Sequence, residues 1–433
     1  MCHTPAMKST LRSFLPALSL AVAASPGFAD NHEAIDAIAS QASVNAALQQ
    51  LVAMEQELLD DLVELTEIPA PPFGEGPRGE RFAAMLAEAG LMEITMDDAG
   101  NVIGRRPGRD GERVIALTAH LDTVFPAETD VTVHIEGNRY IAPGIGDNTR
   151  GLVVLLGILR ALEQASIETG ADVLFIGNTG EEGLGDLRGV KHLFRDGGPR
   201  IDAMIAVDGG DTGRLVYGGV GSHRYRVTFE GPGGHSWGAF GTANPHHALG
   251  RAIDTFVATA PAINSEDEKT SFNIGRIGGG TSINSVPFES WMEVDMRSGS
   301  QAKLDEVDAL FQQAVQQALD EENAARTRGD ALTVTIERVG KRPAARGDRE
   351  SNLVQRAAAA ITWAGIEPNF QLSSTDANYP ISIGVPAITL SRGGISRDAH
   401  SPAESWENVD SHLGLQIVML TLLAEAGVAA PLQ

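Results

Sequence analysis

Cysteine is almost absent from this 433-residue chain, which contains only Cys2. A single thiol cannot close a disulfide within the chain, and Cys2 lies in an N-terminal segment that we expect to be removed. A disulfide scaffold and thiol chemistry are therefore both excluded, and any metal ion must be held by histidine and carboxylate side chains.

Positive charge is also in short supply, because 33 Lys and Arg residues stand against 57 Asp and Glu residues. The resulting net charge of -24 repels the phosphates of nucleic acids and the headgroups of anionic membranes. We therefore exclude nucleic acid and, once the N-terminal segment is removed, the membrane as partners.

The N-terminal segment contains an apolar stretch, residues 14–24, that is too short to span a bilayer. Lys8 and Arg12 precede it, and Gly27, Phe28 and Ala29 form a small-x-small cleavage site. This is the layout of a secretory signal peptide, so we expect cleavage after residues 1–29 and export to the periplasm or the medium.

Short apolar runs that indicate buried strands alternate with helical stretches over much of the remaining chain. This alternation predicts an α/β fold with a mostly parallel sheet and helices on both faces. The length of the chain suits two domains. Strands of the sheet are expected at residues 114–119, 173–177, 204–207 and 385–390.

The central part of the chain has a different order of predicted elements, β-α-β-β-α-β, which is the ferredoxin-like unit. We therefore predict a catalytic domain built from residues 30–220 and 341–433, with a lid or dimerisation domain at 221–340 inserted between them. The six elements of the insert are expected at residues 224–229, 245–259, 272–277, 290–295, 304–322 and 332–339.

Polar side chains follow three of the predicted parallel strands at the point where each strand ends. His120 and Asp122 follow the first strand, Glu181 and Glu182 follow the second, and Asp208 ends the third. The carboxyl ends of such strands line the crevice in which open α/β sheets bind their ligands. We therefore expect these side chains to share one site.

Two loops contribute to the same site: Asp147 lies in the glycine-rich segment GIGDN, and His400 follows the last predicted strand. With His120, Glu182 and Asp208 they make two histidines and three carboxylates, a natural ligand set for zinc. Five ligands suit two ions that share a bridging carboxylate. Zinc is the expected metal, although cobalt or manganese would fit the same ligands.

Several motifs, found in one order along the chain, resemble a known family. The segments TAHLDTVFP, GIGDNTRG, NTGEEGLGDLRG, AVDGG and DAHSPAE are similar to those of the zinc hydrolase superfamily that includes peptidase T, carboxypeptidase G, aminoacylase and acetylornithine deacetylase. The segment TEIPAPPFGE resembles the peptidase T-like branch of that superfamily. The matches run from about Thr66 to Val409.

The resemblance assigns a role to each predicted ligand. It implies that His120 and Asp208 hold one ion, that Glu182 and His400 hold the other, and that Asp147 bridges the two.

The same resemblance gives two further carboxylates a part in catalysis. Asp122 would accept a hydrogen bond from the His120 ring and fix its tautomer. Glu181 would act as the general base, taking a proton from the attacking water.

The inserted domain also carries family-like segments. The resemblance implies that His235, in GGHSWGAFG, would stabilise the oxyanion when the lid closes. In many relatives this histidine comes from the partner subunit, so the resemblance also implies a homodimer through this domain. Asn284 would support it, and Arg297 would bind a substrate carboxylate. Asp376, in SSTDANYP, is family-like without an assigned role. The backbone of the segment SRGGIS would line the substrate pocket at Arg392, Gly393 and Gly394.

These features favour an exported metallopeptidase that cleaves short peptides near a free terminus. Asp rather than Glu at position 208 is commoner among the family members that cleave di- and tripeptides. An N-acyl amino acid amidohydrolase or a carboxypeptidase G-like enzyme would use the same machinery. A rival of another class is a noncatalytic peptide-binding protein, although such a protein would not need Glu181.

Overall fold

The computed structural model describes residues 26–264 and 268–429. The predicted signal peptide lies outside the described residues, apart from residues 26–29, which open helix α1 (Pro26–Ala39). Within the described ranges, no helix has both the length and the apolar character needed to cross a membrane.

The larger part of the molecule is built on a nine-stranded sheet. Eight of its strands follow the order β1-β2-β6-β3-β7-β17-β8-β15, and the ninth, β16, also pairs with β8. Its four central strands are parallel, as predicted: β6 (Asp172–Asn178), β3 (Val114–His120), β7 (Ala203–Val207) and β17 (Ala387–Leu390). Most of the outer pairings are antiparallel. The flanking strands are β1 (Glu93–Met96), β2 (Val102–Arg106), β8 (Arg214–Gly219), β15 (Ala345–Arg346) and β16 (Asn369–Ser373).

Helices cover both faces of this sheet because its central strands are apolar on both sides. Ile115 and Leu117 of β3 belong to the larger core, whereas Ala116, between them, belongs to a smaller core on the other face. The larger core is formed with α5 (Gly151–Gln164), α9 (Asn352–Trp363) and α11 (His412–Ala426), and the smaller one with α6 (Arg188–Leu193) and α10 (Asn378–Ser382).

The N-terminal region of the described chain is helical. Three helices cover it: α1, α2 (Ala42–Ala53) and α3 (Glu55–Thr66), followed by α4 (Gly76–Glu88). The chain breaks at residues 40–41 and at Met54, where no glycine or proline marks the end of a helix. The sequence therefore gives no signal that a helix ends at either position.

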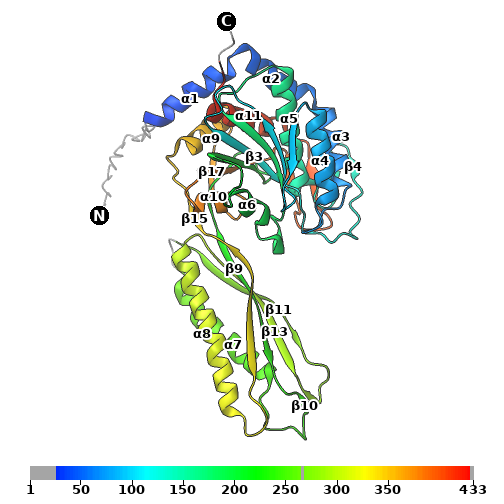
Figure 1. Ribbon diagram of the computed structural model, residues 1–433, viewed down its shortest axis with the longest axis vertical. Helices are drawn as coiled ribbons and strands as arrows, with labels where there is room; N and C mark the ends of the chain where they lie inside the picture. The colour runs from blue at the N-terminus through cyan, green and yellow to red at the C-terminus, as the bar shows by residue number, and fades with distance from the viewer. Residues whose placement is uncertain (1–25, 265–267, 430–433) are drawn as a thin grey trace, which may run out of the picture.

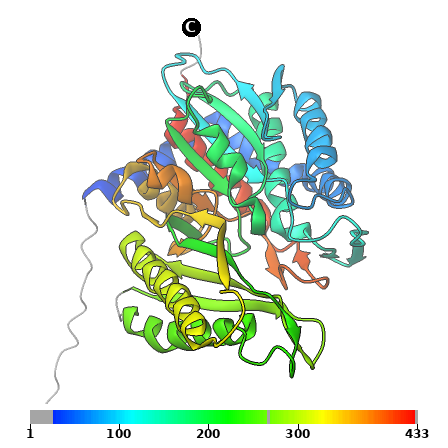
Figure 2. The ribbon, with the colours of Figure 1, turned by 60° about the horizontal axis from the view of Figure 1, so that its bottom comes forward.

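The inserted domain has the predicted β-α-β-β-α-β order, and its four strands form an antiparallel sheet, β11-β13-β9-β14. Helices α7 and α8 cover one face of this sheet (Figures 1 and 2), and Phe229, Phe256 and Phe311 lie in the core between the layers. This confirms the predicted fold class. The elements are β9 (Gly221–Glu230), α7 (Pro245–Thr259), β11 (Thr270–Gly279), β13 (Glu289–Ser298), α8 (Gln301–Ala325) and β14 (Thr333–Arg342).

Two small sheets complete the fold. A ribbon of β10 (Gly234–His235) and β12 (Ser285–Val286) lies at the end of the inserted domain that is far from the large sheet (Figure 1). The second has the order β18-β19-β5-β4 and joins segments distant in sequence. Its strands are β4 (His134–Glu136), β5 (Arg139–Ile141), β18 (Ile395–Arg397) and β19 (Ser405–Glu407).

Candidate metal centre

The central strands deliver side chains to one edge of the large sheet. His120 is the last residue of β3 and stands opposite Asn178, the last residue of β6. Glu182 lies in the turn after β6, and Asp208 follows β7, where its N–H donates to the carbonyl of Leu390 at 2.8 Å. Because the strands are parallel, their carboxyl ends meet at this edge.

Asp147 is positioned by a buried carboxylate that the sequence did not single out. Glu404 is fully buried and accepts three backbone N–H groups: from Gly144 at 2.9 Å, from Gly146 at 3.0 Å and from Asp147 at 2.7 Å. A Cβ at Gly146 would lie 3.1 Å from the Glu404 carboxylate, so the glycine permits this close approach. The loop before α5 is thereby fixed.

His400 lies between β18 and β19, in the left-handed backbone region with φ of +64°. Because β19 pairs with β5, the small sheet holds this loop beside the segment that carries Asp147. The Nε2 atom of His400 lies 2.8 Å from Glu182 Oε1 and 3.3 Å from Asp147 Oδ2. The five predicted ligands are therefore together in space.

These ligands fall into two groups that share one carboxylate. His120, Asp147 and Asp208 form one group, and Asp147, Glu182 and His400 form the other; within each group the ligand atoms lie within 4.8 Å of one another. The two oxygens of Asp147 face different histidines, Oδ1 at 3.4 Å from His120 and Oδ2 at 3.3 Å from His400. Two ligands of a tetrahedral zinc ion stand about 3.4 Å apart. The donor set thus fits two ions bridged by Asp147.

Asp122 is completely buried and organises the turn that carries the two glutamates. Its carboxylate accepts the backbone N–H of Glu181 at 2.9 Å and that of Glu182 at 2.8 Å. The nearer partner of His120 Nδ1 is the Asp122 carbonyl, at 3.0 Å, with the carboxylate at 3.6 Å. The predicted contact with the imidazole ring thus comes from the backbone, while the side chain holds the turn.

Glu181 has a buried partner that the sequence did not reveal. Arg342 ends β14, the last strand of the inserted domain, which runs two residues past the boundary predicted at residue 340. It donates to Glu181 Oε1 at 2.8 Å and to the Glu181 carbonyl. Burial raises the pKa of Glu181 to about 8, with Arg342 opposing the shift and Glu182 adding to it. Glu181, His120 and Glu182 also form a group with metal-ligand spacing, but Arg342 already pairs with the Glu181 carboxylate.

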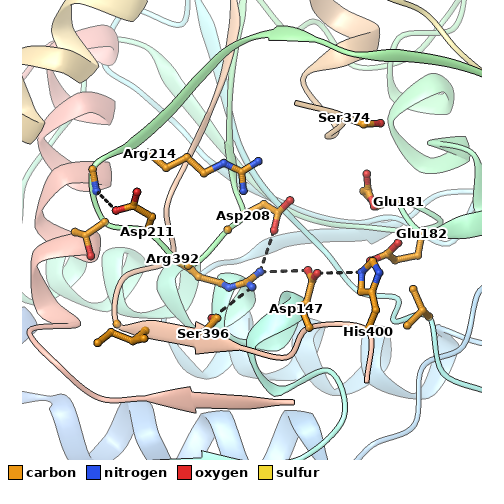
Figure 3. A pocket seen from close by; sticks show the side chains of 18 of the residues that line it. Asp147, Glu181, Glu182, Asp208, Asp211, Arg214, Ser374, Arg392, Ser396 and His400 are labelled. Atoms are coloured by element: carbon orange, nitrogen blue, oxygen red, sulfur yellow. Dashed lines mark hydrogen bonds and ion pairs between the residues drawn. The ribbon is translucent and has the colours of Figure 1, made fainter. Parts of the chain in front are cut away.

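Arg392 differs from its prediction, because its side chain rather than its backbone reaches the site. Its guanidinium lies between Asp208 and Asp147, with Nη1 2.9 Å from one carboxylate and 3.2 Å from the other (Figure 3). Although burial opposes ionisation, Arg392 and the two imidazoles hold the pKa of Asp147 well below its usual range. The two glycines predicted to line the pocket with Arg392 differ: Gly394 lines the cavity, while the Gly393 carbonyl accepts a hydrogen bond from Trp406.

A cavity of about 1040 Å³ opens over the centre, between the large sheet and the inserted domain. Its lining is rich in guanidinium groups as well as carboxylates: Arg214, Arg224, Arg297, Arg342 and Arg392. The prediction that Arg297 faces the site is thus consistent with its position, where its Nε donates to Asp295 at 2.7 Å. The volume suits a small ligand.

The structure does not bring His235 and Asn284 to this cavity. Both lie at the β10–β12 end of the inserted domain, where the Asn284 carbonyl accepts the N–H of Ser236 at 2.9 Å. The pairing of these two segments, and their exposure at the far end of the domain (Figure 1), place them away from the metal centre of their own chain.

Asp376 lies behind the centre, where Asn178 donates to its carboxylate at 2.8 Å. Its pKa is raised to about 6, mainly by burial, with His120 opposing the shift and the charges of Asp122 and Asp208 adding to it. Among histidines without a predicted role, His223 bonds to Asp308 within the inserted domain.

Comparison with known proteins places these features in a family. Residues 116–426 match the model of the Peptidase family M20/M25/M40. The uncharacterized protein YqjE of Bacillus subtilis (strain 168) is 26% identical over 360 residues, or 78% of this chain and 91% of that one. Carboxypeptidase G2 of Pseudomonas sp. (strain RS-16) is 23% identical over 344 residues, 76% and 79% of the two chains. The structure of aminopeptidase PepT from Bacillus cereus ATCC 10987 has a TM-score of 0.68 at 22% identity, covering 86% of this chain and 98% of that one.

Proposed function

This chain belongs to the peptidase family M20/M25/M40 and is a metal-dependent hydrolase of peptide or amide bonds, and we propose that it cleaves short peptides with two divalent ions, zinc in the first place. The observation that carries this proposal is the sharing of Asp147 between two groups of donors. A one-ion site would need only one of these groups.

In this proposal His120 and Asp208 would hold one ion, Glu182 and His400 would hold the other, and Asp147 would serve both. When bound, such ions lower the pKa of a water molecule and polarise the scissile carbonyl. The protein groups supply the rest of the chemistry. Asp122 fixes the turn so that the adjacent glutamates have separate tasks, Glu182 as a ligand and Glu181 as the base.

Glu181 is suited to the role of base because its carboxylate is held by Arg342 beside the metal ligands. It would take the proton of the attacking water and deliver it to the leaving nitrogen. A noncatalytic peptide-binding protein would need neither step, so the placement of Glu181 supports an enzyme.

The arginines of the cavity support a substrate with a free carboxylate. Arg297 and Arg342 both stand opposite Ser222 of β9, one on each side of that strand. A guanidinium fork binds a carboxylate through two parallel hydrogen bonds. Short peptides bound by their C-terminus fit this lining. N-acyl amino acids also fit it and are the second candidate substrates.

The inserted domain supports a homodimer as a further part of this proposal. Large apolar side chains around His235 are exposed, among them Trp237, Phe240, Ile283 and Phe288. An exposed group of this kind marks a surface that a partner covers. A second copy would bring its own His235 and Asn284 to a site that this chain does not reach with them. Export through the N-terminal segment likewise remains part of the proposal.

The test is a metal analysis followed by a substrate panel. Purified protein loaded with zinc is expected to contain two ions per chain and to cleave members of a panel of dipeptides, tripeptides and N-acetyl amino acids. Glu181→Gln, which keeps the shape of the side chain, serves as the matched control and should keep its ions without turnover. A zinc-loaded wild-type protein that binds a peptide and leaves it intact would favour the noncatalytic rival.

A further inference from the structure

Arg392 makes the two metal positions of the proposed centre unequal, because it contacts Asp147 and Asp208 of one position. We propose that its guanidinium is a built-in cation that competes for one of the two metal positions, so that the positions fill with unequal affinity. The position formed by His120, Asp147 and Asp208 would be the weaker one, and the position formed by Asp147, Glu182 and His400 the tighter one. This inference rests on the two-ion site proposed above.

The first argument is the identity of the oxygens that Arg392 contacts. Its Nη1 lies 3.2 Å from Asp147 Oδ1 and 2.9 Å from Asp208 Oδ1. Oδ1 is also the oxygen of Asp147 that faces His120, at 3.4 Å. The guanidinium and an ion beside His120 would therefore draw on the same carboxylate atoms.

The second argument is the asymmetry of these contacts. Among the contacts that the described residues make with Arg392, none involves Glu182 or His400, the other two members of the second group. The Asp147 oxygen that faces His400 is Oδ2, whereas the hydrogen bond from Arg392 goes to Oδ1. Figure 3 shows the guanidinium on the Asp208 side of Asp147 and His400 on the opposite side.

The third argument is that Arg392 is held in place. The residue is 2% exposed, its N–H donates to the Gly209 carbonyl at 3.1 Å, and its Nη1 also lies 3.3 Å from Asn148 Oδ1. An arginine cannot lose its proton at physiological pH. The positive charge is therefore permanent, and an incoming ion meets it in a partly buried site.

These arguments lead to a sequential order of filling. The position beside Glu182 and His400 takes the first ion, while the carboxylate of Asp208 remains paired with Arg392. The second ion must share or displace the guanidinium. Two like charges near 4 Å apart repel strongly in a partly buried site, so we expect the two dissociation constants to differ by about tenfold or more.

The test is calorimetric titration of the demetallated protein with Zn²⁺ or Co²⁺. Wild-type protein should show two separate binding phases. In Arg392→Met the weaker phase should tighten by about tenfold or more, whereas Arg392→Lys, which keeps the charge, should resemble the wild type. Arg297→Met is the matched control: it removes a guanidinium from the same cavity, but one that pairs with Asp295, and should leave both phases unchanged.

Equal affinities in the wild type, or an unaltered weaker phase in Arg392→Met, would overturn the inference. If Arg392→Met does not fold, Asp208→Asn tests the same point, because it should remove the weaker phase and spare the tighter one; loss of the tighter phase would contradict the assignment. A folded wild-type protein that takes up no ion would instead refute the proposed function.

Discussion

Replacement of Asp122 by asparagine tests the turn on which the proposed ligand and base both depend. In the wild type the two carboxylate oxygens accept one backbone N–H each, from Glu181 at 2.9 Å and from Glu182 at 2.8 Å. Asparagine has a single acceptor oxygen. Its amide group would face the other N–H, so that two donors oppose one another at a completely buried position.

The expected loss of folding stability follows from the hydrogen bond that is lost and from the buried N–H that is left without an acceptor. A hydrogen bond to a charged group contributes about 1.5–3 kcal/mol, and an unsatisfied buried N–H costs about 1–3 kcal/mol. Because the turn can relax in part, we expect the free energy of unfolding to fall by about 2–4 kcal/mol. Burial opposes ionisation of Asp122, but His120 and the two N–H groups keep its pKa below the usual value, so the charge is present at neutral pH.

Urea unfolding of the demetallated proteins at pH 7, followed by circular dichroism, measures this loss without a contribution from bound ions. Asp202→Asn is the matched control, because only one of its oxygens, Oδ2, accepts a backbone N–H, that of Val114 at 2.8 Å, which the asparagine oxygen can still accept. The other oxygen pairs with the exposed side chain of Arg200 at 3.0 Å, and losing such an exposed ion pair costs little. The control should lose less than about 1 kcal/mol. If Asp122→Asn were as stable as Asp202→Asn, the proposed function of this carboxylate would be wrong.

Four further predictions address the chemistry and the inserted domain. Glu181→Gln should lower kcat by about 10²–10⁴-fold with unchanged metal content, measured by turnover and elemental analysis. Treatment with a chelator should abolish activity and lower the Tm, and added Zn²⁺ should restore both, because ions that bind only the folded state stabilise it. Asp308→Asn should lower the free energy of unfolding by about 1–3 kcal/mol at neutral pH. Burial raises the pKa of Asp308, but hydrogen bonds from His223 and Tyr225 outweigh burial and hold the pKa below its usual value. The stabilisation by Asp308 is therefore present above about pH 4 and lost as the pH falls through the depressed pKa, which a plot of Tm against pH would show. A mixture of inactive His235→Ala and Glu181→Gln subunits should regain activity if His235 serves the site of its partner, and continued inactivity would argue against a shared site.

The parts of the site that end regular strands could be predicted from the sequence. The apolar run of a buried strand shows in the sequence where the strand ends, and the carboxyl ends of parallel strands line the site. The placement of His120 and Asp208 therefore follows from the positions of β3 and β7 alone. The family match over residues 116–426 confirms the resemblance that the motifs indicated. The signal peptide stays a prediction, because residues 1–25 lie outside the described part of the chain.

The side chains that hold the site from loops could not be predicted in the same way. Arg392 comes two residues after β17, where the alternation of a strand no longer fixes the direction of a side chain. Glu404 belongs to a quoted motif, but its partners, the N–H groups near Asp147, lie 257–260 residues away. The strands β18 and β19 that bring these loops together have three residues each, too few to show a periodic pattern.

The division of tasks between the two domains explains why the chemistry is easier to predict than the substrate. All five proposed ligands and Glu181 come from the catalytic part, whereas Arg224, Arg297 and Arg342 reach the cavity from β9, β13 and β14 of the inserted domain. The proposed metal centre would act on any amide that is placed against it, so the selection of a substrate would come from the groups that place it. Exchanges among these arginines should therefore change which substrates are cleaved. Arg342 is the exception, because it also holds Glu181, and through it the inserted domain takes part in positioning the proposed base.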